Sequence, residues 1–137
     1  IVGVKEASGN ISQVAKLKKL AGNDLDIYSG NDDQVIPILS LGGIGVISVL
    51  SNVRPAAVHD MVMEYLNGNI KSALDIQLKY LDLIEALFCE VNPIPVKKAM
   101  NLMGMNVGPL RSPMCEMGED NARKLAEVMK AYGLKLA

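Results

Sequence analysis

A lysine at the end of a short apolar segment is the first residue of this chain that could do covalent chemistry. The chain opens with IVGVKEASGN, in which residues 1–4 are apolar and rich in β-branched side chains, and Lys5 follows. Such a segment is typical of a strand buried on both faces, as in a parallel sheet. Loss of water there disfavours the charged ammonium form, and a neutral amine attacks carbonyl carbon to form a Schiff base. Lys5 is therefore a candidate nucleophile.

The neighbours of Lys5 predict the direction in which it points. Side chains alternate along a strand, so Gly3 and Lys5 share one face, and Gly3 leaves room there. Val2 and Val4 share the other face, where we expect helices to cover them. Ligands of α/β sheets and barrels bind at the carboxyl ends of the strands, where Lys5 would lie. A simpler interpretation stays open, in which Lys5 pairs with Glu6 or another carboxylate, or turns into solvent.

The elements that would position Lys5 alternate between strand and helix up to residue 66. We expect strands at residues 1–5, 25–29 and 45–50, and helices at residues 12–21, about 34–41 and 55–66. Ser12 can cap the first helix, and Asp32 or Asp33 can be the cap or first-turn acid of the second. Short connections between alternating strands and helices predict parallel strands joined by right-handed crossovers, an α/β fold.

The pattern becomes helical from residue 70 onward. We expect one long amphipathic helix over residues 70–89, a short helix over 95–103 and a last helix over 119–132. No strand is expected after Leu50, so we predict a boundary near residues 67–69, between a β/α part (1–67) and a helical part (68–137). Three βα units do not close a barrel, so the sheet is either small and open or completed by residues outside this chain.

Composition excludes several classes of partner. The net charge is −1, and the chain has four tyrosines, one phenylalanine and no tryptophan, which gives little basis for binding nucleic acid. The longest apolar run, over residues 35–50, is broken by Ser40, Gly42, Gly43 and Gly45, so no membrane span is expected, and no signal peptide is visible. Cys89 and Cys115 share no metal-binding spacing. We expect them to be free thiols in a reducing compartment such as the cytoplasm.

Three other features have ordinary structural interpretations. The GGIG stretch at residues 42–45 resembles a phosphate-binding loop, but it precedes its strand, whereas the dinucleotide fingerprint follows a strand and opens a helix. His59, the single histidine, is expected on a helix surface. The late methionines are expected to fill gaps in packing or in an interface rather than to bind metal. They are Met100, Met103, Met105, Met114 and Met117.

Four stretches of this chain resemble the dihydrodipicolinate synthase family. They are IVGVKEASGN, YSGND, GGIGVISVLSN and NPIPVKKAM, which occur in the family's order and at its spacing. The resemblance covers essentially the whole chain, but only about the carboxyl-terminal half of the family's length. It implies that the chain is the carboxyl-terminal half of a (β/α)8 TIM barrel, with its sixth, seventh and eighth strands, followed by a helical region.

The resemblance also implies a reaction. Lys5 matches the Schiff-base lysine, which condenses with the ketone of pyruvate, and the imine then loses a methyl proton to become an enamine. The enamine attacks the aldehyde of aspartate semialdehyde, in lysine and diaminopimelate biosynthesis. The protonated imine is the electron sink, so no metal or organic cofactor is expected. Gly30 and Ile47 correspond to substrate-binding positions in the pocket wall. From the residues alone, a turn glycine and a core isoleucine remain open as interpretations of these two.

Part of the family's machinery has no counterpart in these residues. The family's proton relay uses a threonine, a tyrosine of the same subunit and a tyrosine of a neighbouring subunit, and this chain contains no threonine. The arginine that holds the second substrate is also expected in the amino-terminal half. Asn31 stands where many members have aspartate, which removes a charge near the pocket mouth. The four tyrosines lie at other positions than the relay: Tyr28, Tyr65, Tyr80 and Tyr132.

Two alternatives to this synthase stay open. One is another pyruvate-dependent aldolase of the same superfamily, similar to N-acetylneuraminate lyase, although KEASGN and NPIPVK favour the synthase. The other is a non-catalytic half barrel that acts only as a scaffold, because exposed strand edges and an incomplete relay favour inactivity of the isolated chain. The partners expected from the resemblance are the missing amino-terminal half of the barrel and further copies of the protein in a homotetramer.

Overall fold

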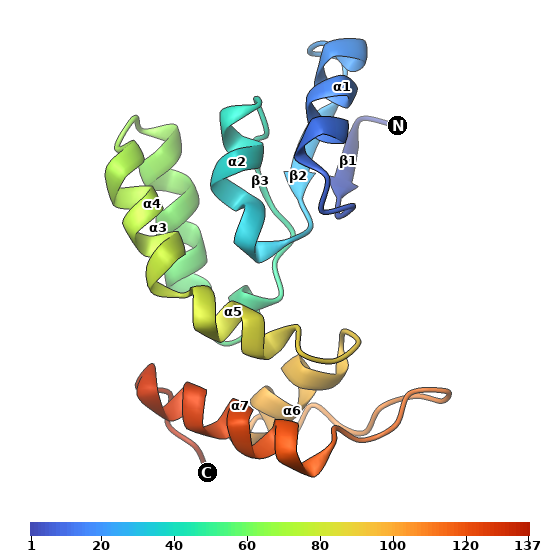
Figure 1. The fold of residues 1–137 in the computed structure, drawn as a ribbon, viewed down its shortest axis with the longest axis vertical. Helices are drawn as coiled ribbons and strands as arrows, with labels where there is room; N and C mark the ends of the chain where they lie inside the picture. The colour runs from blue at the N-terminus through green and yellow to red at the C-terminus, as the bar shows by residue number, and fades with distance from the viewer.

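The structure is a computed structural model that describes residues 1–137, and its first half alternates strands with helices (Figure 1). Three strands form one parallel sheet, as predicted, and their order in it is β1-β2-β3. The elements are β1 (Gly3–Glu6), α1 (Ile11–Ala21), β2 (Asp26–Ser29), η1 (Asp32–Gln34), α2 (Val35–Ser40), β3 (Gly45–Val46), η2 (Leu50–Asn52) and α3 (Pro55–Leu66), where η marks a 3-10 turn.

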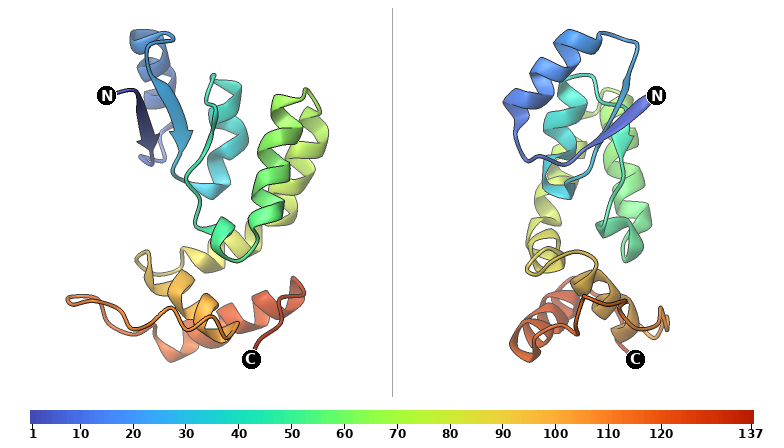
Figure 2. Two further views of the ribbon diagram at one scale, coloured as in Figure 1. Left: turned by 180° about the vertical axis from the view of Figure 1, so that it is seen from behind. Right: turned by 90° about the vertical axis from the view of Figure 1, so that its right-hand side faces the viewer.

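Helices cover one face of this sheet, and its other face is open (Figure 2). Val14 of α1, Ile27 of β2 and Ile38 of α2 are buried against one another, with Val4 packed beside them. Val4 thus lies on the helix side as predicted, whereas Val2 is 82% exposed and the prediction for it was wrong. Val2 precedes the strand, so no helix reaches it.

The ends of two elements differ from the predicted ones. Asn10, not Ser12, caps α1, because its side chain accepts a hydrogen bond from the Gln13 N–H at 3.1 Å. Both residue types are good caps, and the helix starts one residue earlier than expected. β3 ends at Val46 rather than at residue 50, because the chain turns away into η2 after pairing Ser29 with Val46.

The predicted long helix over residues 70–89 is two helices. α4 (Ile70–Lys79) and α5 (Leu81–Leu87) are separated at Tyr80, whose ring stacks on that of Tyr132 at a centroid distance of 5.6 Å. α4 packs Ile76 against one core, formed by Val35, Leu39 and Met61, and α5 buries Leu83 in a different core. One straight helix could not direct its apolar stripe to both cores, so the chain bends between them.

The last helices close the second core of the molecule. α6 (Ile94–Leu102) and α7 (Glu119–Ala131) pack with α5 and with the residues that follow β3. Met117 is buried in this core and Met100, Met103 and Met114 are packed against it, as predicted, whereas Met105 is 50% exposed. None of the helices is both long and apolar enough to cross a membrane.

The glycines of the GGIG stretch serve close packing. A Cβ atom on Gly43 would lie 2.7 Å from Cγ2 and 2.8 Å from the carbonyl oxygen of Ile38, far inside contact distance. Gly42 has φ of +85°, a conformation that side chains disfavour. These two glycines therefore let the chain leave α2 and return directly into β3.

A buried glutamine joins α4 to the segment after β2. Gln77 is 6% exposed; its amide nitrogen donates to the Asp33 carbonyl at 2.6 Å, and its amide oxygen accepts from the Ile36 N–H at 2.8 Å. These two hydrogen bonds thus fix the helical region to the turn that follows β2.

Replacing this glutamine should lower stability. Gln77→Met keeps the length of the side chain but leaves the Ile36 N–H and the Asp33 carbonyl without their partner. An unpaired buried polar group costs about 1–3 kcal/mol, so we expect a loss of that order in the free energy of unfolding, measured by denaturant titration. Gln34→Met, which loses only the exposed bond to the Gly9 carbonyl, should change stability by less than about 0.5 kcal/mol. Equal losses in both variants would contradict the anchoring role of Gln77.

Candidate active site

Lys5 lies at the carboxyl end of β1 on the open face of the sheet. Its register partner on β2 is Tyr28, whose own partner on β3 is Gly45. Register partners on parallel strands project to the same face, so Tyr28 stands beside Lys5. The resemblance implies no role for Tyr28, and nothing in the sequence indicates that it lies beside Lys5. Lys5 itself is exposed in this chain. These residues therefore do not supply the shielding of its ammonium group from water that its position at the strand end predicts.

The alternative of an ion pair with Glu6 is wrong. The three salt bridges of the structure do not include Lys5. Glu6 is 8% exposed and its carboxylate accepts from the Ser8 N–H at 2.6 Å. Alternation along β1 therefore sends Glu6 to the covered side and leaves the Lys5 ammonium free on the open side.

Gly30 is in direct proximity to the Lys5 side chain. It follows β2, and its N–H donates to the Glu6 carbonyl at 2.7 Å. A Cβ atom here would lie 3.0 Å from Cε of Lys5 and 2.6 Å from Cβ of Ala7. Its φ is not positive, so space rather than backbone conformation requires glycine. Gly30 is a turn glycine that also lets the backbone approach the stem of Lys5.

Ile47 lies at the same carboxyl edge, immediately after β3. Its N–H donates to the Ser29 carbonyl at 2.8 Å, which extends the pairing of β2 and β3 by one bond. The side chain is 48% exposed and belongs to none of the three hydrophobic clusters, so the core-packing interpretation is wrong for this chain. The structure thus brings Lys5, Gly30 and Ile47 to one edge of the sheet.

Asp32 is a buried residue near this edge that sequence reasoning treated only as a helix cap. It is 1% exposed, and its Oδ2 accepts hydrogen bonds from the Val49 and Leu50 N–H groups, both at 2.9 Å. It does lie in the first turn of η1 as expected, but its carboxylate is directed to the segment after β3. Nothing in the sequence distinguishes the buried Asp32 from its exposed neighbour Asp33.

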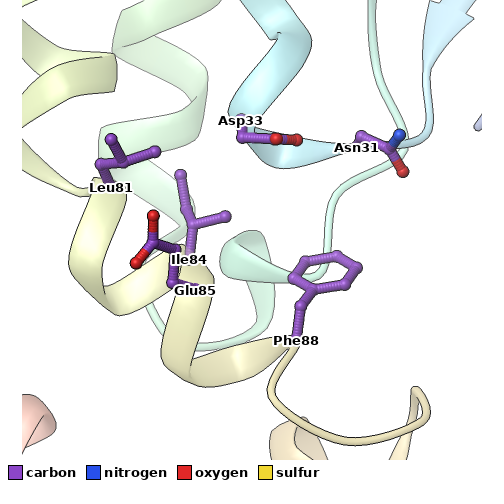
Figure 3. A pocket seen from close by; sticks show the side chains of 6 residues that line it. All are labelled: Asn31, Asp33, Leu81, Ile84, Glu85 and Phe88. Carbon is purple, nitrogen blue, oxygen red and sulfur yellow. The ribbon is translucent and has the colours of Figure 1, made fainter. Parts of the chain in front are cut away.

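A cavity of about 260 Å³ adjoins the turn after β2 (Figure 3). Asn31 and Asp33 line it on one side, and α5 with the following residue lines it on the other through Leu81, Ile84, Glu85 and Phe88. Asn31 borders this cavity, but Lys5, Gly30 and Ile47 do not line it, so the place of Asn31 at the mouth of the substrate pocket stays a prediction. Because residue 31 carries an amide, the carboxylates that line the cavity are those of Asp33 and Glu85.

The remaining residues singled out in the sequence lie away from Lys5. His59 is exposed on α3 and contacts Asp60 at 3.1 Å, as expected of a surface histidine. Tyr80 and Tyr132 stack on each other in the helical region. Cys89 and Cys115 are free, as predicted, and both are exposed.

The Glu6 carboxyl group has an altered acidity. Hydrogen bonds from the side chain and backbone N–H of Ser8 lower the pKa of Glu6 below its ordinary value of 4.5, and they outweigh the opposite effect of burial. The Glu6 carboxyl group is therefore more acidic in the folded protein than in the unfolded chain.

This acidity predicts the direction of one pH effect. Because the folded-state pKa of Glu6 is below 4.5, the Glu6 carboxylate stabilises the fold fully above about pH 4.5, and this stabilisation is lost as the pH falls through the folded-state pKa. Glu6→Gln should lower the melting temperature at pH 7, and the difference from the unsubstituted protein should shrink toward acid pH. Melting curves recorded between pH 3 and 7 measure this difference in melting temperature. Asp75→Asn, at an exposed pair with Lys71, is the control, and a pH-independent difference for Glu6→Gln would contradict the assignment.

Comparison with known proteins agrees with this geometry. The model of the dihydrodipicolinate synthetase family matches residues 1–132. The 4-hydroxy-tetrahydrodipicolinate synthase of Thermoanaerobacter sp. (strain X514) is 60% identical over 134 residues, which are 98% of this chain and 45% of that protein. The chain thus spans about half the length of the curated relatives that it matches.

Solved structures give the same result. The dihydrodipicolinate synthase of Aquifex aeolicus has a TM-score of 0.95 at 39% identity, over 99% of this chain and 46% of that one. The chloride-inhibited enzyme of Acinetobacter baumannii, solved in complex with pyruvate, has a TM-score of 0.92 at 31% identity, over 98% of this chain and 46% of that one.

The fold and the site define an α/β protein built like part of a (β/α)8 barrel, with a lysine at the carboxyl edge of its parallel sheet. The chain belongs to the dihydrodipicolinate synthetase family. The family resemblance of its sequence motifs is thereby confirmed.

Proposed function

We propose that this chain is the carboxyl-terminal part of a 4-hydroxy-tetrahydrodipicolinate synthase, a lyase of lysine and diaminopimelate biosynthesis. Its substrates are pyruvate and aspartate semialdehyde, and Lys5 is its imine-forming residue. The Nζ of Lys5 attacks the pyruvate ketone and water leaves, which gives the imine; a methyl proton then leaves, and the resulting enamine carbon bonds to the aldehyde carbon. The product cyclises and releases the lysine.

The proximity of Gly30 to the Lys5 stem is the observation on which this proposal mainly rests. A Cβ atom on Gly30 would lie 3.0 Å from Lys5 Cε, so backbone, not a side chain, borders the amine on this side. Pyruvate bound to Lys5 would lie between the backbone at Gly30 and that at Ile47, whose carbonyl would face the intermediate. A relative 31% identical to this chain has been solved in complex with pyruvate.

We further propose that β1, β2 and β3 are the sixth, seventh and eighth strands of a closed barrel. In this chain both outer edges of the sheet are free, and an apolar groove of about 250 Å³ borders β3, lined by Gly45, Val46 and side chains of α3. A first strand supplied by an amino-terminal half would pair with β3 and fill this groove. Residues 1–67 then form the barrel part, and residues 68–137 form the appended helical region. The complete protein is proposed to be a cytoplasmic homotetramer.

Reductive trapping tests the proposal. The intact protein that contains this chain is mixed with pyruvate, reduced with borohydride and digested, and the peptides are mapped by mass. We expect the reduced adduct on the peptide that contains Lys5. An adduct on a different lysine, or none in a protein that contains a complete barrel, would reject the assignment.

The same sample separates the remaining alternatives. If the adduct forms but aspartate semialdehyde is not consumed, the protein is another pyruvate-dependent aldolase. If this chain occurs without any amino-terminal half and no adduct forms, the non-catalytic scaffold is favoured. The free edges of β1 and β3 are the observation that keeps this second candidate in view.

A further inference from the structure

Asp32 joins two chain segments at the carboxyl edge of the sheet, the first of which borders the Lys5 side chain. Gly30 lies two residues before Asp32, in the turn after β2, and Ile47 lies two residues before Val49, in the connection after β3. The hydrogen-bonded pairing of β2 with β3 ends with the bond from the Ile47 N–H to the Ser29 carbonyl. Beyond that point, the Asp32 carboxylate holds the two segments together through the N–H groups of Val49 and Leu50.

The surroundings of Asp32 make this link rigid. The residue is 1% exposed, Val49 is 6% exposed and Leu50 is fully buried, so water does not compete for the two hydrogen bonds. Both N–H groups also converge on one oxygen of the carboxyl group, so the side chain is attached to the segment after β3 at two successive residues. The other oxygen, Oδ1, is buried without a partner, so the two bonds to Oδ2 are the only hydrogen bonds of the side chain in this chain.

We infer that Asp32 is a positioning residue, which sets the gap between the backbone at Gly30 and the backbone at Ile47 and thereby the fit of the keto acid bound at Lys5. This inference rests on the proposed function. β3 pairs with β2 through only two register positions, so its ladder cannot by itself fix the segment that follows. A displacement of about 1 Å at a reacting group can cost on the order of 10²-fold in rate, so a link of this kind affects catalysis without touching the substrate.

The test compares two substitutions of Asp32 with a core substitution in the intact protein. Asp32→Ala removes the link, whereas Asp32→Asn keeps an oxygen that can accept both N–H groups. We expect Asp32→Ala to raise KM for pyruvate by about tenfold or more and to accelerate amide hydrogen exchange at Ile47, Val49 and Leu50. Asp32→Asn should stay within about threefold of the unsubstituted protein. Leu125→Ala, in the second core, should lower the melting temperature comparably but leave KM and these amides unchanged.

A second variant covers the case in which Asp32→Ala does not fold. Asp32→Glu keeps the carboxylate but lengthens it by one methylene, so it should shift the two segments and raise KM in a folded protein. The inference is overturned if KM and local exchange are unchanged in Asp32→Ala or Asp32→Glu, or if Leu125→Ala reproduces the changes. Failure of the proposed function is distinguishable, because the unsubstituted protein would then trap no pyruvate at Lys5, and local exchange alone would decide the role of Asp32.

Discussion

Replacing Lys5 by arginine should abolish trapping of pyruvate and lower the synthase rate of the intact protein by about 10³-fold or more, the order of loss seen when a covalent nucleophile is removed. A guanidinium group stays protonated and cannot form an imine, yet it keeps a long cationic side chain on the open face of β1. Because Lys5 makes no salt bridge, its replacement removes no ion pair. The melting temperature should therefore change little. Enzyme assays measure the loss of synthase rate, and borohydride reduction with peptide mapping measures the loss of pyruvate trapping.

The control for this prediction is another lysine of the same βα unit. Lys19→Arg changes an exposed residue in the last turn of α1 and should leave both trapping and rate unchanged. If Lys5→Arg kept a pyruvate adduct elsewhere in the protein, or retained more than about a tenth of the rate, the amine of Lys5 would not be the nucleophile.

The strands and their order could be predicted because their signal is local. Short β-branched runs that alternate with helices leave few topologies other than a parallel sheet, and alternation along β1 is enough to separate Lys5 from Val4. The edge that Lys5, Gly30 and Ile47 share follows from the same rule, since parallel strands end together. The exposure of Lys5 could not be predicted, because it depends on whether other chain segments cover the open face.

Features that depend on tertiary packing could not be predicted. Nothing in the amphipathic pattern of residues 70–89 marks Tyr80, because the break there arises from two cores that lie in different directions. Asp32 and Asp33 are equivalent as sequence, and only the N–H groups after β3 distinguish them. Gln77 is likewise an ordinary helical residue until the segment after β2 folds against it.

Adding a single methyl group at Gly30 should impair both stability and imine formation. In Gly30→Ala the new Cβ atom would lie 2.6 Å from Ala7 Cβ and 3.0 Å from both the Glu6 carbonyl and Lys5 Cε, so at least one of these groups has to move. Overpacking of this kind typically costs about 1–3 kcal/mol in the free energy of unfolding. The turn after β2 cannot relax freely, because the Gly30 N–H is bonded to the Glu6 carbonyl at 2.7 Å.

The contacts with Ala7 Cβ and the Glu6 carbonyl can be relieved only by shifting the segment after β1 relative to the turn after β2, and the Lys5 stem, the flexible third member of the contact, should be displaced as well. We therefore expect the rate of pyruvate trapping at Lys5 to fall by about 10²-fold, more than the loss of stability alone would produce. Gly118→Ala is the matched control: its φ is −58° and its nearest contact, Glu90 Oε1 at 3.4 Å, is ordinary. Trapping rates by mass spectrometry and denaturant titrations of both variants separate the two effects. A Gly30→Ala protein that lost stability but trapped pyruvate at the normal rate would show that the backbone at Gly30 does not position the amine.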